Sequence, residues 1–278
     1  MGNLDGKVAF ITGVARGQGR SHAERLASEG ADIIGLDICE DIPTMDYPNA
    51  SEGDLEQAVK AVESYGRRML ARKADVRDAA AVQSVADDGF DTFGRIDIAL
   101  SNAGIVRLGP CQDAEQELRL WEDTVATNLT GAFHVVRAVV PRMIAGERGG
   151  VIILTGSTAG VRPIGGFAGG PLAYTASKFG LVGIGKQMAE ALAVHSIRVN
   201  VIHPTGVASG MTMNEAMQGL MAQAAAGGAN TIAAMQNALP VDILQPADIS
   251  DTVAFLVSDQ AKYITGVSLP VDAGFSVR

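Results

Sequence analysis

The chain has 278 residues, 47% of them hydrophobic and 19% charged, with a formal net charge of −9. This composition excludes a disordered chain, and a surface this acidic argues against nucleic acid or anionic membrane as a partner. Only two cysteines occur and no apolar stretch reaches the ~18 residues of a membrane span, so we expect a cytoplasmic protein without a disulfide framework.

Short apolar runs alternate with helix-length amphipathic segments along the chain. We predict strands at residues 8–11, 33–36, 69–74, 96–100, 151–154, 197–202 and 267–271, and helices in segments such as 54–66, 78–93, 115–145 and 174–195. Such alternation is typical of right-handed βαβ units. We therefore predict one Rossmann-type α/β domain over residues 1–278, a doubly wound parallel sheet of about seven strands with helices on both faces.

Two long segments interrupt this alternation. Residues 38–53 form an insertion that exceeds the ~2–6 residues of a usual βα connection. Residues 204–245 are apolar and include Met211, Met213, Met217, Met221 and Met235. Such a segment fits a core helix, but it follows a predicted strand end, where α/β folds bind ligands, so a substrate lid fits equally well.

A glycine-rich segment, TGVARGQG, follows the first predicted strand and opens a helix. Gly13, Gly17 and Gly19 allow a sharp turn and close backbone approach to a pyrophosphate, and the helix amino end offers N–H donors. Arg16 and Gln18 belong to the same turn. Many loops are rich in glycine, but the position after the first strand favours a dinucleotide site.

Asp37 ends the second predicted strand and is followed by Ile38 rather than by a basic residue. An acid at this place bonds the adenosine ribose hydroxyls and repels a 2′-phosphate, which favours NAD over NADP. Arg16 in the glycine turn favours NADP instead, because its side chain could meet a 2′-phosphate. Further cofactor contacts are expected at the ends of the third and fourth strands, from Asp75, Val76, Asn102, Ala103 and Gly104.

Tyr174 and Lys178 are spaced to share one face of a helix. An ammonium beside a phenol stabilises the phenolate and lowers a pKa that is ordinarily about 10, so Tyr174 is a candidate general base or acid. Ser157 follows the fifth strand and could hydrogen-bond the same substrate oxygen. Alone, each feature also fits an ordinary helix face or turn.

Together these motifs resemble the short-chain dehydrogenase/reductase family over nearly the whole chain. The matching residues are Thr12, Gly13, Gly17, Gly19, Asp75, Asn102-Ala103-Gly104, Asn128, Ser157, Tyr174, Lys178 and Pro204. The resemblance implies that Asn128 holds a water in a proton relay to Lys178, and that Lys178 also bonds the nicotinamide ribose. It places Pro204, Gly206, Val207 and Ser209 near the nicotinamide, with Ser209 in place of a more usual threonine.

A narrower set of features looks like the mycofactocin-coupled, carveol dehydrogenase-like branch of that family. The set comprises the 38–53 insertion, Gly66-Arg67-Arg68, the segment from Ala74 to Asp78, and His203-Pro204-Thr205 leading into Met211. This resemblance implies a tightly held NAD whose electrons pass to a peptide-derived carrier. The wider family commonly forms tetramers through its two long helices, here 115–145 and 174–195, so a homotetramer is expected.

The function predicted is an NAD-dependent interconversion of an apolar secondary alcohol and its ketone. The Met-, Ala- and Leu-rich lid has no cluster of cations, which favours an apolar substrate. An NADPH-dependent carbonyl or acyl-carrier reductase is the main alternative, and a non-catalytic dinucleotide sensor is a more distant one. His22, His134, His195 and His203 lack metal-ligand spacing, so no metal site is expected.

Overall fold

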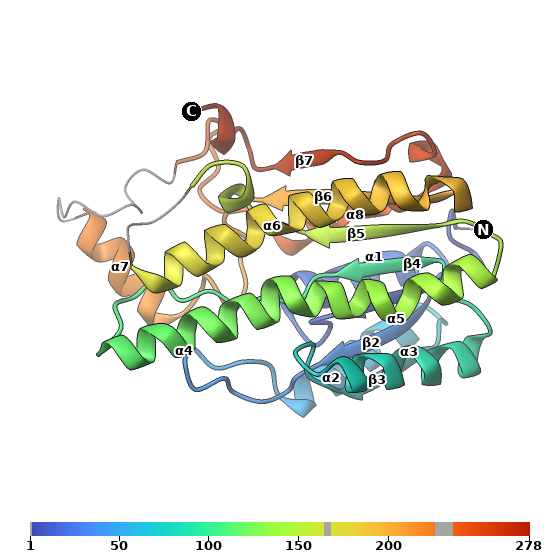
Figure 1. Ribbon diagram of the computed structural model, residues 1–278, viewed down its shortest axis with the longest axis horizontal. Helices are drawn as coiled ribbons and strands as arrows, with labels where there is room; N and C mark the ends of the chain where they lie inside the picture. Colours follow the sequence, from blue (N-terminus) through green and yellow to red (C-terminus); the bar gives the residue numbers. More distant parts are fainter. Residues whose placement is uncertain (1, 164–167, 226–235) are drawn as a thin grey trace.

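The computed structural model describes residues 2–163, 168–225 and 236–278 (Figure 1). Its strands are β1 (Val8–Thr12), β2 (Asp32–Asp37), β3 (Met69–Lys73), β4 (Ile98–Ser101), β5 (Gly150–Thr155), β6 (Ile197–Pro204) and β7 (Ser268–Val271). Its α-helices are α1 (Gly17–Ser28), α2 (Glu52–Glu63), α3 (Ala79–Phe93), α4 (Ala114–Val125), α5 (Gly131–Ala145), α6 (Gly169–Leu192), α7 (Glu215–Ala225) and α8 (Pro246–Val257).

All seven strands form one sheet in the order β3-β2-β1-β4-β5-β6-β7, and every neighbouring pair is parallel. The chain order reverses between β1 and β4, so the loops that follow these two strands part to opposite faces of the sheet. Ligands in open α/β sheets bind at the carboxyl ends of the strands at such a point. The predicted Rossmann-type fold is confirmed.

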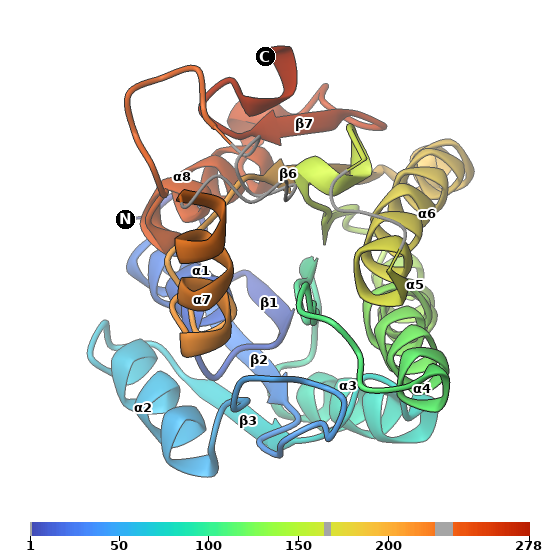
Figure 2. The ribbon, with the colours of Figure 1, turned by 90° about the vertical axis from the view of Figure 1, so that its left-hand side faces the viewer.

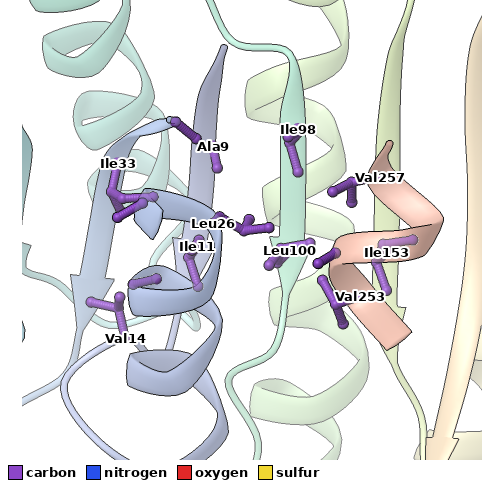
Figure 3. Close-up of a cluster of buried hydrophobic side chains, with 14 of the residues drawn as sticks. Ala9, Ile11, Val14, Leu26, Ile33, Ile98, Leu100, Ile153, Val253 and Val257 are labelled. Atoms are coloured by element: carbon purple, nitrogen blue, oxygen red, sulfur yellow. The ribbon is translucent and has the colours of Figure 1, made fainter. Parts of the chain in front are cut away.

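The central strands are buried on both faces, which is why they are continuous apolar runs rather than alternating ones. Figure 2 shows α1, α2 and α8 on one side of the sheet and α3, α5 and α6 on the other. On the first side, Leu26 of α1 and Val253 of α8 pack against Ile11, Leu100 and Ile153 of the strands (Figure 3). On the other side, the apolar faces of α3, α5 and α6 form a second core cluster.

Two helix predictions need correction. The expected helix over 115–145 is two α-helices joined by a π-helical segment, Ala126–Thr130, which carries Asn128. Helix α6 begins at Gly169, ahead of the predicted start at residue 174, and Pro171 lies in its first turn, where proline is tolerated. Met235 of the predicted lid lies outside the described residues. None of the described helices is long and apolar enough to cross a membrane.

Candidate active site

A cleft follows the carboxyl edge of the sheet. It consists of two adjoining cavities of about 880 Å³ and 780 Å³, counted with the solvent space at their open mouths. They share Gln18, Asn102, Gly104, Ser209 and Met211 as lining residues. The first cavity lies over the ends of β1, β2 and β3, and the second lies against β5, β6 and α6. The shared residues make the two cavities one continuous site.

The glycine turn forms the floor of the first cavity. Gly13 and Gly17 have φ values of +67° and +56°, a left-handed conformation that favours glycine. Helix α1 begins here with no side-chain cap and no acidic residue in its first turn, so its amino end suits an anion such as a pyrophosphate. The side-chain oxygen of Gln18 is buried without a hydrogen-bond partner in the described structure.

Gly19 differs from the other predicted glycines, because it does not line either cavity. A Cβ at this position would overlap the Gly13 carbonyl and lie 2.9 Å from the Asn102 amide nitrogen. Gly19 therefore allows α1 to pack closely against the turn, and its predicted contact with the cofactor stays a prediction.

A reciprocal hydrogen-bonded clamp joins the glycine turn to the loop after β4. The Thr12 hydroxyl accepts from the backbone N–H groups of Asn102 and Ala103, both at 3.0 Å. The Asn102 side-chain amide donates back to the Thr12 carbonyl at 3.1 Å. Because Asn102, Ala103 and Gly104 all line the first cavity, this clamp fixes their position relative to the turn.

Asp37 and Ile38 lie where the sequence predicts, at the edge of the first cavity. Burial raises the pKa of Asp37, and one carboxylate oxygen accepts from the Ala15 backbone at 3.0 Å. Arg16 also lines the cavity, but its guanidinium donates to the Pro48 carbonyl at 2.7 Å. A Cβ on Gly210 would lie 2.7 Å from this guanidinium. Arg16 thus bridges the insertion and the lid.

Asp75 and Val76 line the far end of the first cavity, as predicted. The sequence did not predict that Arg77 holds Asp75, with its backbone N–H and its Nε both 2.8 Å from the carboxylate. Arg77 also pairs with Asp123 of α4 at 2.7 Å. Asp75 is therefore oriented from outside the cavity before any ligand binds.

The 38–53 insertion folds over the first cavity, which it lines with Ile42, Tyr47, Asn49 and Ala50. Thr44 donates to Asp123 at 2.6 Å, and the buried Tyr47 hydroxyl accepts from the Val106 backbone at 3.2 Å. The Arg107 guanidinium donates to the Thr44 carbonyl at 3.0 Å. None of these lining residues was predicted, and the one available signal was the length of the insertion.

Tyr174, Ser157 and Lys178 meet in the second cavity. Burial raises the pKa of Tyr174, while a hydrogen bond with the Ser157 side chain opposes the rise. Lys178 donates to the Thr155 carbonyl at 2.8 Å, and burial lowers its pKa to about 8. The sequence predicted a tyrosine pKa lowered by the neighbouring ammonium, and this direction is wrong, because burial raises the pKa of Tyr174.

Asn128 lies behind the cleft and lines neither cavity. Its side-chain oxygen accepts from the Ile105 N–H at 2.8 Å, and its amide donates to the Ile105 carbonyl at 2.9 Å and to the Ser177 hydroxyl at 3.3 Å. Ser177 in turn donates to the Tyr174 carbonyl at 2.7 Å. Asn128 thereby ties the loop after β4 to the helix that carries Tyr174 and Lys178.

The rest of the second cavity comes from the end of β6 and from the lid. The predicted cofactor residues Pro204, Gly206, Val207 and Ser209 line it, together with Val106, Leu108, Met211 and Met217. Among all its lining residues, Lys178 is the one charged side chain. In the part of the chain that the structure describes, no group of three or more His, Cys, Asp or Glu residues could hold a metal ion.

Comparison with known proteins places this cleft in context. The family model for short chain dehydrogenases matches residues 7–219. An uncharacterized oxidoreductase of Mycobacterium tuberculosis is 46% identical over 272 residues, which are 98% of this chain and 97% of the relative. The (-)-trans-carveol dehydrogenase of Rhodococcus erythropolis is 39% identical over 282 residues, with both chains fully covered. The crystal structure of carveol dehydrogenase from Mycobacterium avium in complex with NAD has a TM-score of 0.90 and 41% identity, again over both full chains.

The buried ammonium of Lys178 predicts a pH-dependent stability. Its pKa of about 8 lies below the ordinary 10.5, so its burial cost is complete below pH 8 and is relieved as the pH rises toward 10.5. Lys178→Met should therefore raise the free energy of unfolding of the cofactor-free protein at pH 7 by roughly 1–3 kcal/mol, less the lost bond to Thr155.

Urea unfolding at pH 7 and pH 10 measures this difference, which should shrink at the higher pH. Lys60→Met, on the exposed face of α2, is the matched control and should show no such trend. A change of stability in Lys178→Met that is the same at both pH values would contradict the expectation.

Proposed function

The chain belongs to the short-chain dehydrogenase family, as its motifs predicted, and from that premise we propose an NAD-dependent oxidoreductase that interconverts an apolar secondary alcohol and its ketone. One observation carries the proposal. Tyr174, Ser157 and Lys178 stand in an otherwise uncharged cavity that continues directly into the cavity of the glycine turn. A substrate oxygen and a dinucleotide would therefore meet in one cleft.

We assign the proton chemistry to the residues of the second cavity. Tyr174 takes the proton from the substrate hydroxyl during oxidation and returns it to the carbonyl oxygen during reduction. Ser157 holds the same oxygen through its hydroxyl, and Lys178 in its ammonium form stabilises the phenolate. Asn128 belongs to the proton relay to Lys178 that the family resemblance implies. Bound NAD supplies the hydride chemistry.

The first cavity supports NAD as the dinucleotide. The uncapped amino end of α1 and the turn at Gly13 and Gly17 suit the pyrophosphate, and Lys178 would bond the nicotinamide ribose. The Asp37 carboxylate stands where a 2′-phosphate would be repelled. Arg16, which the sequence left open as a 2′-phosphate contact, already donates to the Pro48 carbonyl. The relative from Mycobacterium avium was crystallised in complex with NAD.

Substrate class follows from the walls of the second cavity. Val106, Leu108, Met211 and Met217 offer apolar surface, and among the described lining residues Lys178 is the one cation that could pair with a phosphate or carboxylate. The carveol dehydrogenase relatives extend this to a cyclic, terpenoid-like alcohol. The segment from Gly206 to Met217 therefore serves as the substrate side of a lid.

Tyr174→Phe tests the assigned base directly. Loss of the phenol proton should lower turnover of an apolar secondary alcohol by about 10³-fold or more, because no other group in the cavity replaces it. The dissociation constant for NAD should change less than about 3-fold, since the ring and its packing remain. Tyr263→Phe, at an 89% exposed position, is the control and should keep full turnover. Turnover preserved in a folded Tyr174→Phe protein would sink the assignment.

We further propose that the insertion slows NAD exchange and that a carrier of the mycofactocin type reoxidises the retained cofactor. The support is the set of anchors over the first cavity, in which Thr44, Tyr47 and Pro48 each bond a different element. A ligand beneath such a cover leaves only when some of these bonds break. Slow exchange then requires an external electron acceptor rather than free NAD.

Mass analysis of dinucleotide released from the denatured, dialysed protein tests retention, and about one NAD per chain is expected. Thr44→Val removes the bond to Asp123 and should speed the loss of NAD during dialysis by about 10-fold. Thr92→Val is the control, because the Thr92 hydroxyl bonds only its own helix at Asp88. A protein purified empty would overturn retention, and recovery of NADP would overturn the role of Asp37.

We also propose a homotetramer, supported by apolar side chains left exposed on neighbouring helices. Leu118 and Trp121 of α4, Phe133 of α5 and Phe179 of α6 are exposed. Helices α4 and α5 run end to end, and α6 lies beside them (Figure 1). Large apolar side chains that lie exposed on adjacent helices are typical of protein interfaces. Sedimentation velocity should show a species of about four times 28.8 kDa, which Phe179→Glu should dissociate. A monomer at all concentrations would contradict this proposal.

A further inference from the structure

A histidine lies directly behind the cleft and has no part in the mechanism above. His203 is fully buried at the end of β6, and neither cavity includes it among its lining residues. Its Nδ1 is 2.7 Å from the Ser157 carbonyl oxygen, and its Nε2 is 3.0 Å from the Ser268 hydroxyl of β7. Both ring nitrogens are therefore engaged, and one of them contacts the residue that holds the substrate oxygen.

The contacts fix the tautomer of the ring. A carbonyl oxygen can only accept, so the 2.7 Å contact with Ser157 requires the proton on Nδ1. The longer 3.4 Å approach of the Ser157 N–H to the same nitrogen is then not a hydrogen bond. Nε2 is left free to accept from the Ser268 hydroxyl. Burial lowers the pKa of His203, which keeps this ring neutral at working pH.

The backbone around Ser157 is shaped to receive the ring. A Cβ on Gly156 would lie 2.6 Å from Nδ1 of His203, and one on Gly160 would lie 3.0 Å from Cε1. The first distance is too short for a side chain, and the second is tighter than an ordinary contact, so the two glycines leave room for the imidazole. The turn from Gly156 to Gly160 therefore packs on His203 as well as bonding to it.

We propose that His203 is a positioning residue for Ser157. It pins the Ser157 carbonyl, which also accepts from the Gly160 N–H at 2.8 Å, and so fixes the direction of the side-chain hydroxyl toward Tyr174. A displacement of about 1 Å at such a group costs up to about 10²-fold in rate. This inference rests on the proposed function, because it explains what orients the Ser157 hydroxyl that is proposed to hold the substrate oxygen.

Three substitutions separate positioning from bulk stability. His203→Asn places an amide N–H near the position of Nδ1 and keeps the bond to Ser157. His203→Gln carries its amide near Nε2 and keeps only the bond to Ser268. His203→Leu keeps neither. For each variant, kcat and KM for an apolar secondary alcohol are compared with the dissociation constant for NAD and with Tm.

His203→Gln and His203→Leu should lower kcat by about 10- to 100-fold, with KM and the NAD dissociation constant within about 3-fold of the unmodified protein. His203→Asn should keep kcat within about 3-fold. Equal losses in the Asn and Gln variants, or losses that follow Tm or NAD affinity, would overturn the proposal.

A second measurement needs no variant to fold. In the ¹⁵N-histidine spectrum of the unmodified protein, the His203 ring should be the neutral tautomer protonated on Nδ1; protonation on Nε2 instead would overturn the proposal. This readout also distinguishes the two proposals. A protein that turns over no alcohol contradicts the proposed function, while the tautomer still tests the contact between His203 and Ser157.

Discussion

The clamp between Thr12 and Asn102 is the interaction on which the site depends. It joins the end of β1 to the end of β4 at the point where the order of the sheet reverses. The Thr12 hydroxyl accepts from two backbone N–H groups after β4, and the Asn102 side-chain amide donates to the Thr12 carbonyl. Strands β1 and β4 pair within the sheet, and the clamp extends their connection to the two loops that diverge beyond them. It thereby fixes the floor of the first cavity, against which the rest of the cleft is built.

From this clamp, a chain of hydrogen bonds leads to the opposite wall of the cleft. Gly104 leads into Ile105, whose N–H and carbonyl are both bonded by Asn128, and Asn128 reaches Ser177 in the helix that presents Tyr174 and Lys178. The π-helical segment at Ala126–Thr130 places Asn128 among these partners. Segments like this one recur at functional sites because the additional residue re-aims a side chain within an otherwise regular helix.

Sequence reasoning located the elements that depend on local pattern. Apolar runs such as residues 8–11 marked the strands, and the spacing of Tyr174 and Lys178 marked a shared helix face. It missed what depends on contacts between distant segments, including Tyr47 in the wall of the first cavity and Arg77 holding Asp75. No periodicity signals that Thr44 meets Asp123. The predicted direction of the Tyr174 pKa shift was wrong for the same reason, because the burial that raises this pKa is a property of the packed fold.

The anchored insertion has a consequence for the kinetics of the enzyme. Under the proposed retention, a cover held by bonds from Thr44, Tyr47 and Pro48 to three different parts of the fold would make the dinucleotide a resident group rather than a co-substrate. The alcohol and the electron acceptor would then enter the same cleft in turn. The alcohol would meet the oxidised nicotinamide, and the acceptor would meet the reduced one. Such an enzyme follows a double-displacement rate law, with parallel reciprocal plots, where an exchangeable dehydrogenase follows a sequential one.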